Sequence, residues 1–135
     1  IDRYDVTSSV MVPTHFQRLL AVEPSVREST DVSSMQLIAH TGSACPADVK
    51  RAMIDWFGPI LLESYGGSES GTLCRIGSQD WLTHPGSVGT VVEPYRVLVV
   101  DESGADVEPG SVGILAFEAP DGFGVAYHRD AEKTA

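Results

Sequence analysis

Residues 35–71 read MQLIAHTGSACPADVKRAMIDWFGPILLESYGGSESG, and this stretch decides the fold. Two short apolar runs in it, 35–39 and 60–64, are typical of buried strands. Between them, apolar residues recur at helical spacing, at Val49, Ala52, Met53, Trp56 and Phe57. Gly58 and Pro59 then end the helix. The stretch therefore predicts a strand, a helix and a second strand.

The residues before this stretch predict one more strand and helix. Residues 6–12 are rich in β-branched and small side chains, as a buried strand would be. Thr14 and Gln17 have the spacing of a capping box, and an apolar helix face follows at Phe16, Leu19 and Leu20. Alternating strands and helices imply right-handed crossovers and a parallel sheet. The fold class is α/β, with a parallel βαβαβ segment over residues 1–71.

Residues 72–135 predict a different architecture. Strands are expected near 95–100 and 114–117, with turns at 101–104 and 108–110. The tetrapeptide Gly-Ser-Val-Gly occurs at 86–89 and again at 110–113, which indicates two similar strand entries. We expect a β-rich lobe here, either a small antiparallel sheet or part of a β-barrel.

Composition excludes several classes of protein. The chain has 135 residues, 42% of them hydrophobic, which is enough for a packed core. No apolar run reaches the roughly 18–20 residues of a membrane helix, so no transmembrane segment is expected. The net charge is −10, which argues against a nucleic-acid partner. Two cysteines make no disulfide framework, and no signal sequence is visible, so we expect a cytoplasmic protein. Neither end resembles a natural terminus, which suggests a segment of a longer protein.

Two loops of small residues, 40–46 and 65–71, follow predicted parallel strands and should share one edge of the sheet. The Tyr65 ring can stack on a base, and glycines let a ligand approach the backbone. The Ser68 hydroxyl can donate to phosphate oxygens. Glu69 would repel phosphates unless a divalent cation lay between, so it predicts Mg²⁺. The alternative is a plain hairpin in which Gly66 and Gly67 only supply positive φ angles.

Residues 65–69, YGGSE, are similar to the Tyr-Gly-x-Thr-Glu motif of the adenylate-forming (AMP-binding) enzymes. That family includes acyl-CoA synthetases, the amino-acid adenylation domains of peptide synthetases, and beetle luciferases. Four more segments resemble its motifs in the same order: TGSACP at 41–46, HPGSVG at 84–89, the stretch 101–115, and YHRDAEKT at 127–134.

The resemblance implies a chemistry and a place in a larger protein. In the family, a carboxylate attacks the α-phosphate of ATP, pyrophosphate leaves, and in the synthetases CoA then accepts the acyl group. The partners implied are a small carboxylic acid such as a fatty acid, ATP and CoA, with Mg²⁺. Residues 1–71 and 72–135 would both belong to one larger AMP-binding domain.

The resemblance also implies roles for individual residues. Tyr65 would stack on adenine, while Glu63, Ser64 and Gly66 would edge the adenine or the acyl group. Ser68 would bind the α-phosphate in place of the usual Thr, and Glu69 would hold Mg²⁺. The wall between the adenine and the acyl group would be formed by Gly42, Ser43 and Ala44.

Two departures from the family pattern bear on the branch. Peptide-synthetase domains usually have Asn before the Tyr and Pro after the first Gly, where this chain has Ser64 and Gly67. This favours an acyl-CoA synthetase over amino-acid adenylation and leaves a luciferase-like oxidase open. Gly67 replaces a residue that is often larger, which would widen the acyl pocket.

Several of the family's catalytic parts are absent, including its upstream phosphate loop and its C-terminal domain with the catalytic Lys. We therefore expect the isolated chain to form no adenylate. One alternative is a non-catalytic nucleotide-binding module. Another is an interaction protein with purely structural glycine loops. In either case, exposed sheet edges would let the chain self-associate.

Overall fold

The structure is a computed structural model that describes residues 1–120 and 126–134. A turn of 3₁₀ helix, η1 (Asp2–Tyr4), opens the chain. The α-helices are α1 (Pro13–Leu20), α2 (Pro24–Ser29), α3 (Ala47–Phe57), α4 (Ser78–Thr83) and α5 (Ala131–Thr134). The strands are β1 (Ser8–Met11), β2 (Leu37–His40), β3 (Leu61–Gly67), β4 (Gly71–Gly77), β5 (Thr90–Val91), β6 (Arg96–Val100) and β7 (Ile114–Glu118).

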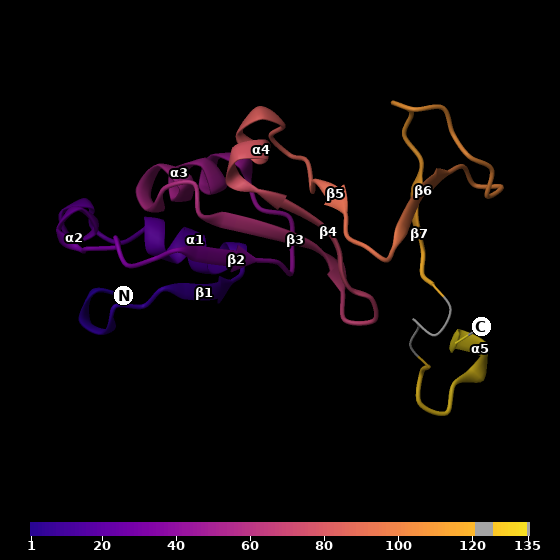
Figure 1. The fold of residues 1–135 in the computed structure, drawn as a ribbon, viewed down its shortest axis with the longest axis horizontal. Coiled ribbons are helices and arrows are strands. Elements are labelled where there is room, and N and C mark those ends of the chain that lie inside the picture. Colours follow the sequence, from indigo (N-terminus) through magenta and orange to yellow (C-terminus); the bar gives the residue numbers. More distant parts are fainter. Residues whose placement is uncertain (121–125, 135) are drawn as a thin grey trace.

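The first five strands form one mixed sheet in sequence order (Figure 1). β1, β2 and β3 run parallel, as the alternating strand and helix pattern predicts. β4 then pairs antiparallel with β3, and β5 pairs antiparallel with β4. The α/β prediction is confirmed, and the sheet is wider than the parallel segment expected from the sequence.

The core lies between this sheet and the helices α1, α3 and α4. Phe16 of α1 and Met53 of α3 are fully buried, and Trp81 of α4 is 2% exposed. They meet Ile38 and Leu61 from the strands in one hydrophobic cluster. Each such side chain contributes roughly 1.5–3 kcal/mol when buried. The core therefore fixes the parallel strands against the helices and holds their carboxyl ends in place.

Ser78 joins α4 to β3. Its buried hydroxyl donates to the Leu61 carbonyl at 3.0 Å and accepts from the Leu61 N–H at 2.9 Å. Both backbone groups of the first β3 residue are thus satisfied by one side chain. The short helix α4 carries Trp81, whose burial in the core fixes the helix against the sheet.

β3 continues through Tyr65, Gly66 and Gly67, where the sequence predicts a loop. The strand persists because β4 comes very close here: a Cβ on Gly66 would lie 1.8 Å from the Gly71 carbonyl oxygen. A bulge interrupts the pairing between Tyr65 and Gly66. The segment is therefore a hairpin, but neither Gly66 nor Gly67 has the positive φ that the plain hairpin interpretation assumed.

The two Gly-Ser-Val-Gly segments both lead into strands, as expected. Gly89 precedes β5 with φ +85°, and a Cβ there would lie 2.0 Å from the Arg75 carbonyl oxygen. Gly113 precedes β7, and a Cβ there would lie 2.7 Å from the Val100 carbonyl oxygen. In each copy the second glycine lets the chain pass close to a neighbouring strand.

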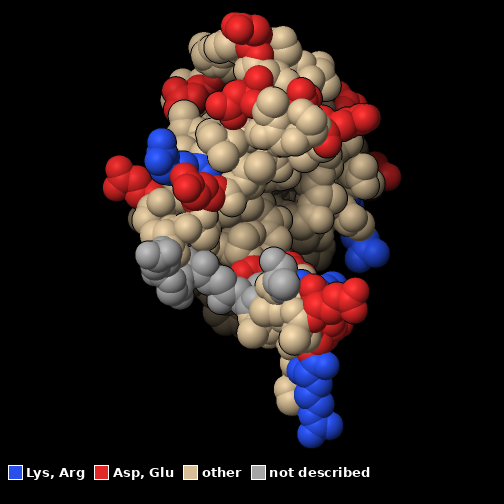
Figure 2. Space-filling view, turned by 90° about the vertical axis from the view of Figure 1, so that its right-hand side faces the viewer, with Lys and Arg blue, Asp and Glu red and all other residues tan. Residues whose placement is uncertain are grey.

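β6 and β7 form a separate two-stranded antiparallel sheet, which confirms the expected small antiparallel lobe. Figure 2 views the molecule from the side of this hairpin, and acidic side chains gather at the top of that view. The connection between the strands contributes the exposed acids Asp101, Glu102, Asp106 and Glu108. A division into domains at residue 71 stays a prediction; β4 and β5 complete the first sheet. In the described part of the chain, no helix is long and apolar enough to cross a membrane.

Candidate functional site

Two segments that are far apart in sequence meet at the carboxyl ends of β2 and β3. These strands pair directly, so the loop after β2 lies beside the end of β3. Residues 41–45 and 63–66 line one hollow of about 380 Å³, together with Trp81 and residues 86–88. We call it the Tyr65 hollow. The expectation that the two loops share one edge of the sheet is confirmed.

The Tyr65 hollow gathers most of the predicted nucleotide-binding residues: Gly42, Ser43, Ala44, Glu63, Ser64, Tyr65 and Gly66. Tyr65 is 41% exposed, so much of its ring is open to a ligand. The Phe117 ring of β7 lies 6.2 Å away, tilted by 35°. Gly42 has φ +93°, a conformation in which glycine is favoured.

A second hollow of about 520 Å³ shares part of this wall, and we call it the Gly67 hollow. It contains Gly67 and Ser68, and it shares Thr41, Gly42, Ser64 and Gly66 with the Tyr65 hollow. Its remaining lining residues are Val10, Ala39, His40, Gly71 and Thr72. The segments 41–42 and 64–66 therefore stand between two spaces, as a wall between two parts of one ligand would.

Glu69 lines neither hollow and lies exposed in the β3–β4 turn. Its Oε1 accepts a hydrogen bond from the Tyr127 hydroxyl at 3.2 Å, which raises the pKa of Tyr127. Across residues 1–120 and 126–134, no group of three His, Cys, Asp or Glu side chains could hold a metal. A single exposed carboxylate fits a Mg²⁺ ion that takes its other ligands from phosphate and water.

Lys50 is the functional candidate that the sequence analysis missed. It is completely buried, forms an ion pair with Glu63, and lies 4.7 Å from the centroid of the Trp81 ring. Burial lowers the pKa of Lys50, and the hydrogen bond to Glu63 opposes that shift. The signal was in the spacing: the buried face of α3 is Lys50, Met53, Ile54 and Phe57, one position away from the predicted face.

His40 completes this polar cluster. It is 1% exposed, and its Nε2 lies 3.8 Å from Oε2 of Glu63. Within the part of the chain that the structure describes, neither ring nitrogen has a hydrogen-bond partner. Burial, together with the nearby Lys50 charge, lowers the pKa of His40 to about 4, although Glu63 acts in the opposite direction. His40 is therefore neutral at physiological pH.

Most of the chain matches the sequence model of a known protein family. The family model of AMP-binding enzymes matches residues 1–126. The chain belongs to the AMP-binding enzyme family. This confirms the resemblance drawn from the YGGSE segment and the motifs around it.

Curated relatives of this AMP-binding chain are acyl-CoA ligases. A long-chain-fatty-acid–CoA ligase of Salmonella typhimurium is 30% identical over 118 residues, covering 87% of this chain and 21% of the relative. The mitochondrial acyl-coenzyme A synthetase ACSM5 of Mus musculus is 32% identical over 140 aligned residues, covering 98% of this chain and 23% of the relative. The chain thus spans about a fifth of the length of these relatives.

Solved structures share the fold of this AMP-binding chain. The anthranilate CoA ligase AuaEII, crystallised with anthranoyl-AMP, superposes with a TM-score of 0.83 at 26% identity. The match covers 99% of this chain and 25% of AuaEII. MatB from Rhodopseudomonas palustris matches with a TM-score of 0.78 at 29% identity, over 96% of this chain and 25% of MatB.

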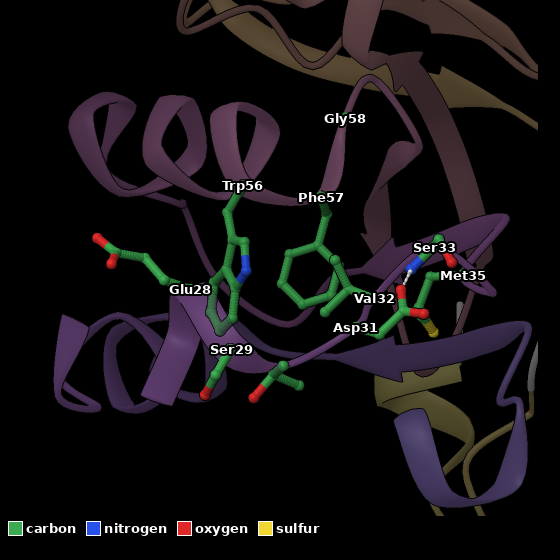
Figure 3. Close-up of a pocket in the computed structure, with 10 residues that line it drawn as sticks. Glu28, Ser29, Asp31, Val32, Ser33, Met35, Trp56, Phe57 and Gly58 are labelled. Atoms are coloured by element: carbon green, nitrogen blue, oxygen red, sulfur yellow. Dashed lines mark hydrogen bonds between the residues drawn. The ribbon is translucent and has the colours of Figure 1, made fainter. Parts of the chain in front are cut away.

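Another hollow, of about 560 Å³, lies at the opposite end of the sheet (Figure 3). Met35 and Gly58, which line it, precede β2 and β3, so it opens at the amino-terminal ends of these strands. Trp56 and Phe57 form one side, and Asp31 Oδ1 accepts from the Ser33 N–H at 2.9 Å. It contains none of the motif residues of this AMP-binding chain, so we assign it no role.

Proposed function

We propose that this chain carries the adenylate-binding part of an ATP-dependent acyl-CoA ligase. Such an enzyme activates a carboxylic acid as acyl-AMP and transfers the acyl group to CoA. The observation that carries the proposal is the meeting of residues 41–45 and 63–66 around the exposed Tyr65 ring. The names of the curated relatives, which are acyl-CoA ligases, support the branch and a fatty acid as the class of substrate.

In this proposal the Tyr65 hollow receives the nucleotide base. The ring of Tyr65 offers one stacking surface, and Gly42, Ser43 and Ala44 line the same hollow. Glu63, Ser64 and Gly66 edge the base. The small side chains let the base approach the backbone closely.

The phosphates would extend from this hollow toward Ser68 and Glu69. The Ser68 hydroxyl donates to an α-phosphate oxygen, the role that the resemblance gives it. Glu69 fits as a ligand for Mg²⁺, because its carboxylate is exposed and only one of its oxygens has a partner among the described residues. Mg²⁺ bound there would offset negative charge on the phosphate oxygens.

The Gly67 hollow would receive the acyl group of the acid. It lies across the shared wall from the Tyr65 hollow, so an acyl-AMP could place its two halves on either side. Among its lining residues only His40 has an ionisable side chain, and burial keeps that ring neutral. An uncharged acyl group therefore suits this space. A cytoplasmic location and transfer to CoA stay part of the proposal.

The test is the Glu69→Gln variant of the full-length protein, assayed by ATP–pyrophosphate exchange with a panel of fatty acids. Removing the charge should reduce exchange by about 100-fold and raise the Mg²⁺ concentration needed for half-maximal rate. Glu102→Gln is the matched control, because Glu102 is exposed on the connection between β6 and β7. It should leave exchange unchanged. Near-normal exchange in Glu69→Gln would contradict the role of this residue, and a wild-type protein without exchange would favour a non-catalytic nucleotide-binding module.

A further inference from the structure

The ion pair between Lys50 and Glu63 lies at the wall of the Tyr65 hollow. Lys50 is wholly buried, while the Glu63 side chain keeps 12% of its surface exposed and lines the hollow. The carboxylate thus faces the hollow on one side and a buried cation on the other. Buried ion pairs are costly to desolvate and are often replaceable by apolar residues without loss of stability. We therefore look for a role of this ion pair in the site rather than in stability.

The pleat of β3 puts Glu63 and Tyr65 on the same side of the strand, since they are two residues apart. A base stacked on Tyr65 would therefore have its edge near the Glu63 carboxylate. An ionised carboxylate only accepts hydrogen bonds. It would attract an amino group on that edge and repel a carbonyl oxygen in the same place.

The preference of the Glu63 carboxylate for an amino group depends on Lys50. Two other ionisable side chains lie near Glu63: His40, which is neutral and 3.8 Å away, and Cys45, whose thiol pKa is raised to about 11 by burial and by the Glu63 charge. The Lys50 Nζ also lies 4.7 Å from the centroid of the Trp81 ring. Without Lys50, the Glu63 carboxylate would lose the ion pair that fixes its direction, and a carboxylate turned away from the hollow would no longer distinguish an amino group from a carbonyl oxygen.

We propose that Lys50 is a positioning residue that holds the Glu63 carboxylate aimed into the Tyr65 hollow. In this way it makes the site select a base with a 6-amino group over one with a 6-oxo group. This inference rests on the proposed function and deepens it, because it assigns base selection to a side chain that never touches the nucleotide.

The test compares binding of AMP and inosine monophosphate, which differ at position 6 of the base, by isothermal titration of the full-length protein. Wild type should prefer AMP by about tenfold or more. Lys50→Met removes the charge at similar length, and its preference should fall to within about threefold of unity. Lys50→Arg keeps the charge and should restore the preference. Arg51→Met is the matched control: Arg51 is exposed on the same helix, with its guanidinium 5.9 Å from the Trp81 ring, so the preference should not change.

Circular dichroism confirms the fold of each variant. If Lys50→Met does not fold, the neutral double variant Lys50→Met/Glu63→Gln is measured instead. An amide can turn either its oxygen or its nitrogen to the base, so the preference should again be lost. A folded Lys50→Met, or the double variant, that keeps the wild-type preference overturns the inference. So does a wild type that binds both nucleotides equally. A wild type that binds neither AMP nor an acyl-adenylate analogue contradicts the proposed function itself.

Discussion

Gly66 occupies a position where β3 has no room for a side chain. Gly66→Ala would put a Cβ 1.8 Å from the Gly71 carbonyl oxygen, which is backbone and cannot turn away. We expect a loss of about 2 kcal/mol or more in the free energy of unfolding, measured with urea. Gly67→Ala is the control, because its Cβ would meet nothing closer than 3.4 Å and its φ is not positive. Equal stability of the two variants would show that the hairpin is not built this way.

His40 makes the stability of the protein depend on pH. In the unfolded chain a histidine takes up a proton below about pH 6.5, whereas in the folded protein His40 stays neutral down to a pKa of about 4. The unfolded state therefore binds more protons between these values. Stability should fall as the pH drops through this window, by up to roughly 3 kcal/mol.

The measurement for His40 is urea unfolding at pH 7, 6, 5 and 4 on wild type and on His40→Gln, which cannot titrate. The difference between the two proteins isolates the contribution of His40 from those of the carboxylates. NMR of the ring protons checks the cause directly, since the His40 signal should not titrate near pH 6.5. A His40 that titrates there would mean that the ring is exposed or charged in solution.

Among the elements, the junction of α4 with β3 depends on one hydroxyl. Ser78→Ala leaves the buried N–H and carbonyl of Leu61 without their side-chain partner. We expect this to cost about 2 kcal/mol in thermal or urea unfolding. Ser29→Ala is a control on an exposed hydroxyl at the end of α2 and should change stability by less than about 0.5 kcal/mol. If Ser78→Ala loses no more unfolding free energy than Ser29→Ala, the hydroxyl of Ser78 does not hold α4 against β3 in solution.

Elements with a clear apolar period could be predicted from the sequence, and those fixed by distant contacts could not. β2, α3 and the start of β3 follow from periodicity and from the stop at Gly58. β4 and α4 were missed, because Ile76 and Trp81 show their burial only when they meet the core. The predicted buried face of α3 lies one position away from the observed face, because a lysine is rarely a core residue unless it is paired and Lys50 was therefore not counted as buried.

For the site, the meeting of the motif residues could be predicted from the sequence, but the partners of its two acidic residues could not. The motif residues Gly42 and Tyr65 come together because the neighbouring parallel strands β2 and β3 end side by side, which the sequence pattern implies. The partner of Glu63 could not be predicted, since pairing with Lys50 depends on how α3 is rotated over the sheet. The hydrogen bond from Tyr127 to Glu69 joins residues 58 positions apart, and the sequence gives no local signal for it.

At the scale of the whole molecule, the described chain leaves apolar strand residues uncovered. Val97, Leu98 and Ile114 of the β6–β7 sheet are 39–56% exposed, and Val10 of the edge strand β1 is 76% exposed. Self-association through these surfaces stays a prediction. Sedimentation velocity of the 135-residue chain over a range of concentrations tests it: we expect the sedimentation coefficient to rise with concentration, and a monomer throughout would contradict it.

The isolated chain should also lack catalysis. The family resemblance implies an upstream phosphate loop and a catalytic Lys in a C-terminal domain, and no segment of the 135 residues resembles either of them. ATP–pyrophosphate exchange on the chain alone should stay at background at any Mg²⁺ concentration. Robust exchange would show that residues 1–135 suffice for the chemistry.

The central claim is that the segments on either side of the Tyr65 hollow bind one adenylate together. NMR titration of the ¹⁵N-labelled chain with AMP, and then with a non-hydrolysable acyl-adenylate analogue, tests this most directly. The account predicts that the amide signals of Gly42 and Tyr65 shift together, with one binding constant, and that those of Gly67 and Thr72 respond further to the analogue. Titrations in which Gly42 and Tyr65 do not move, or move with different binding constants, would contradict it.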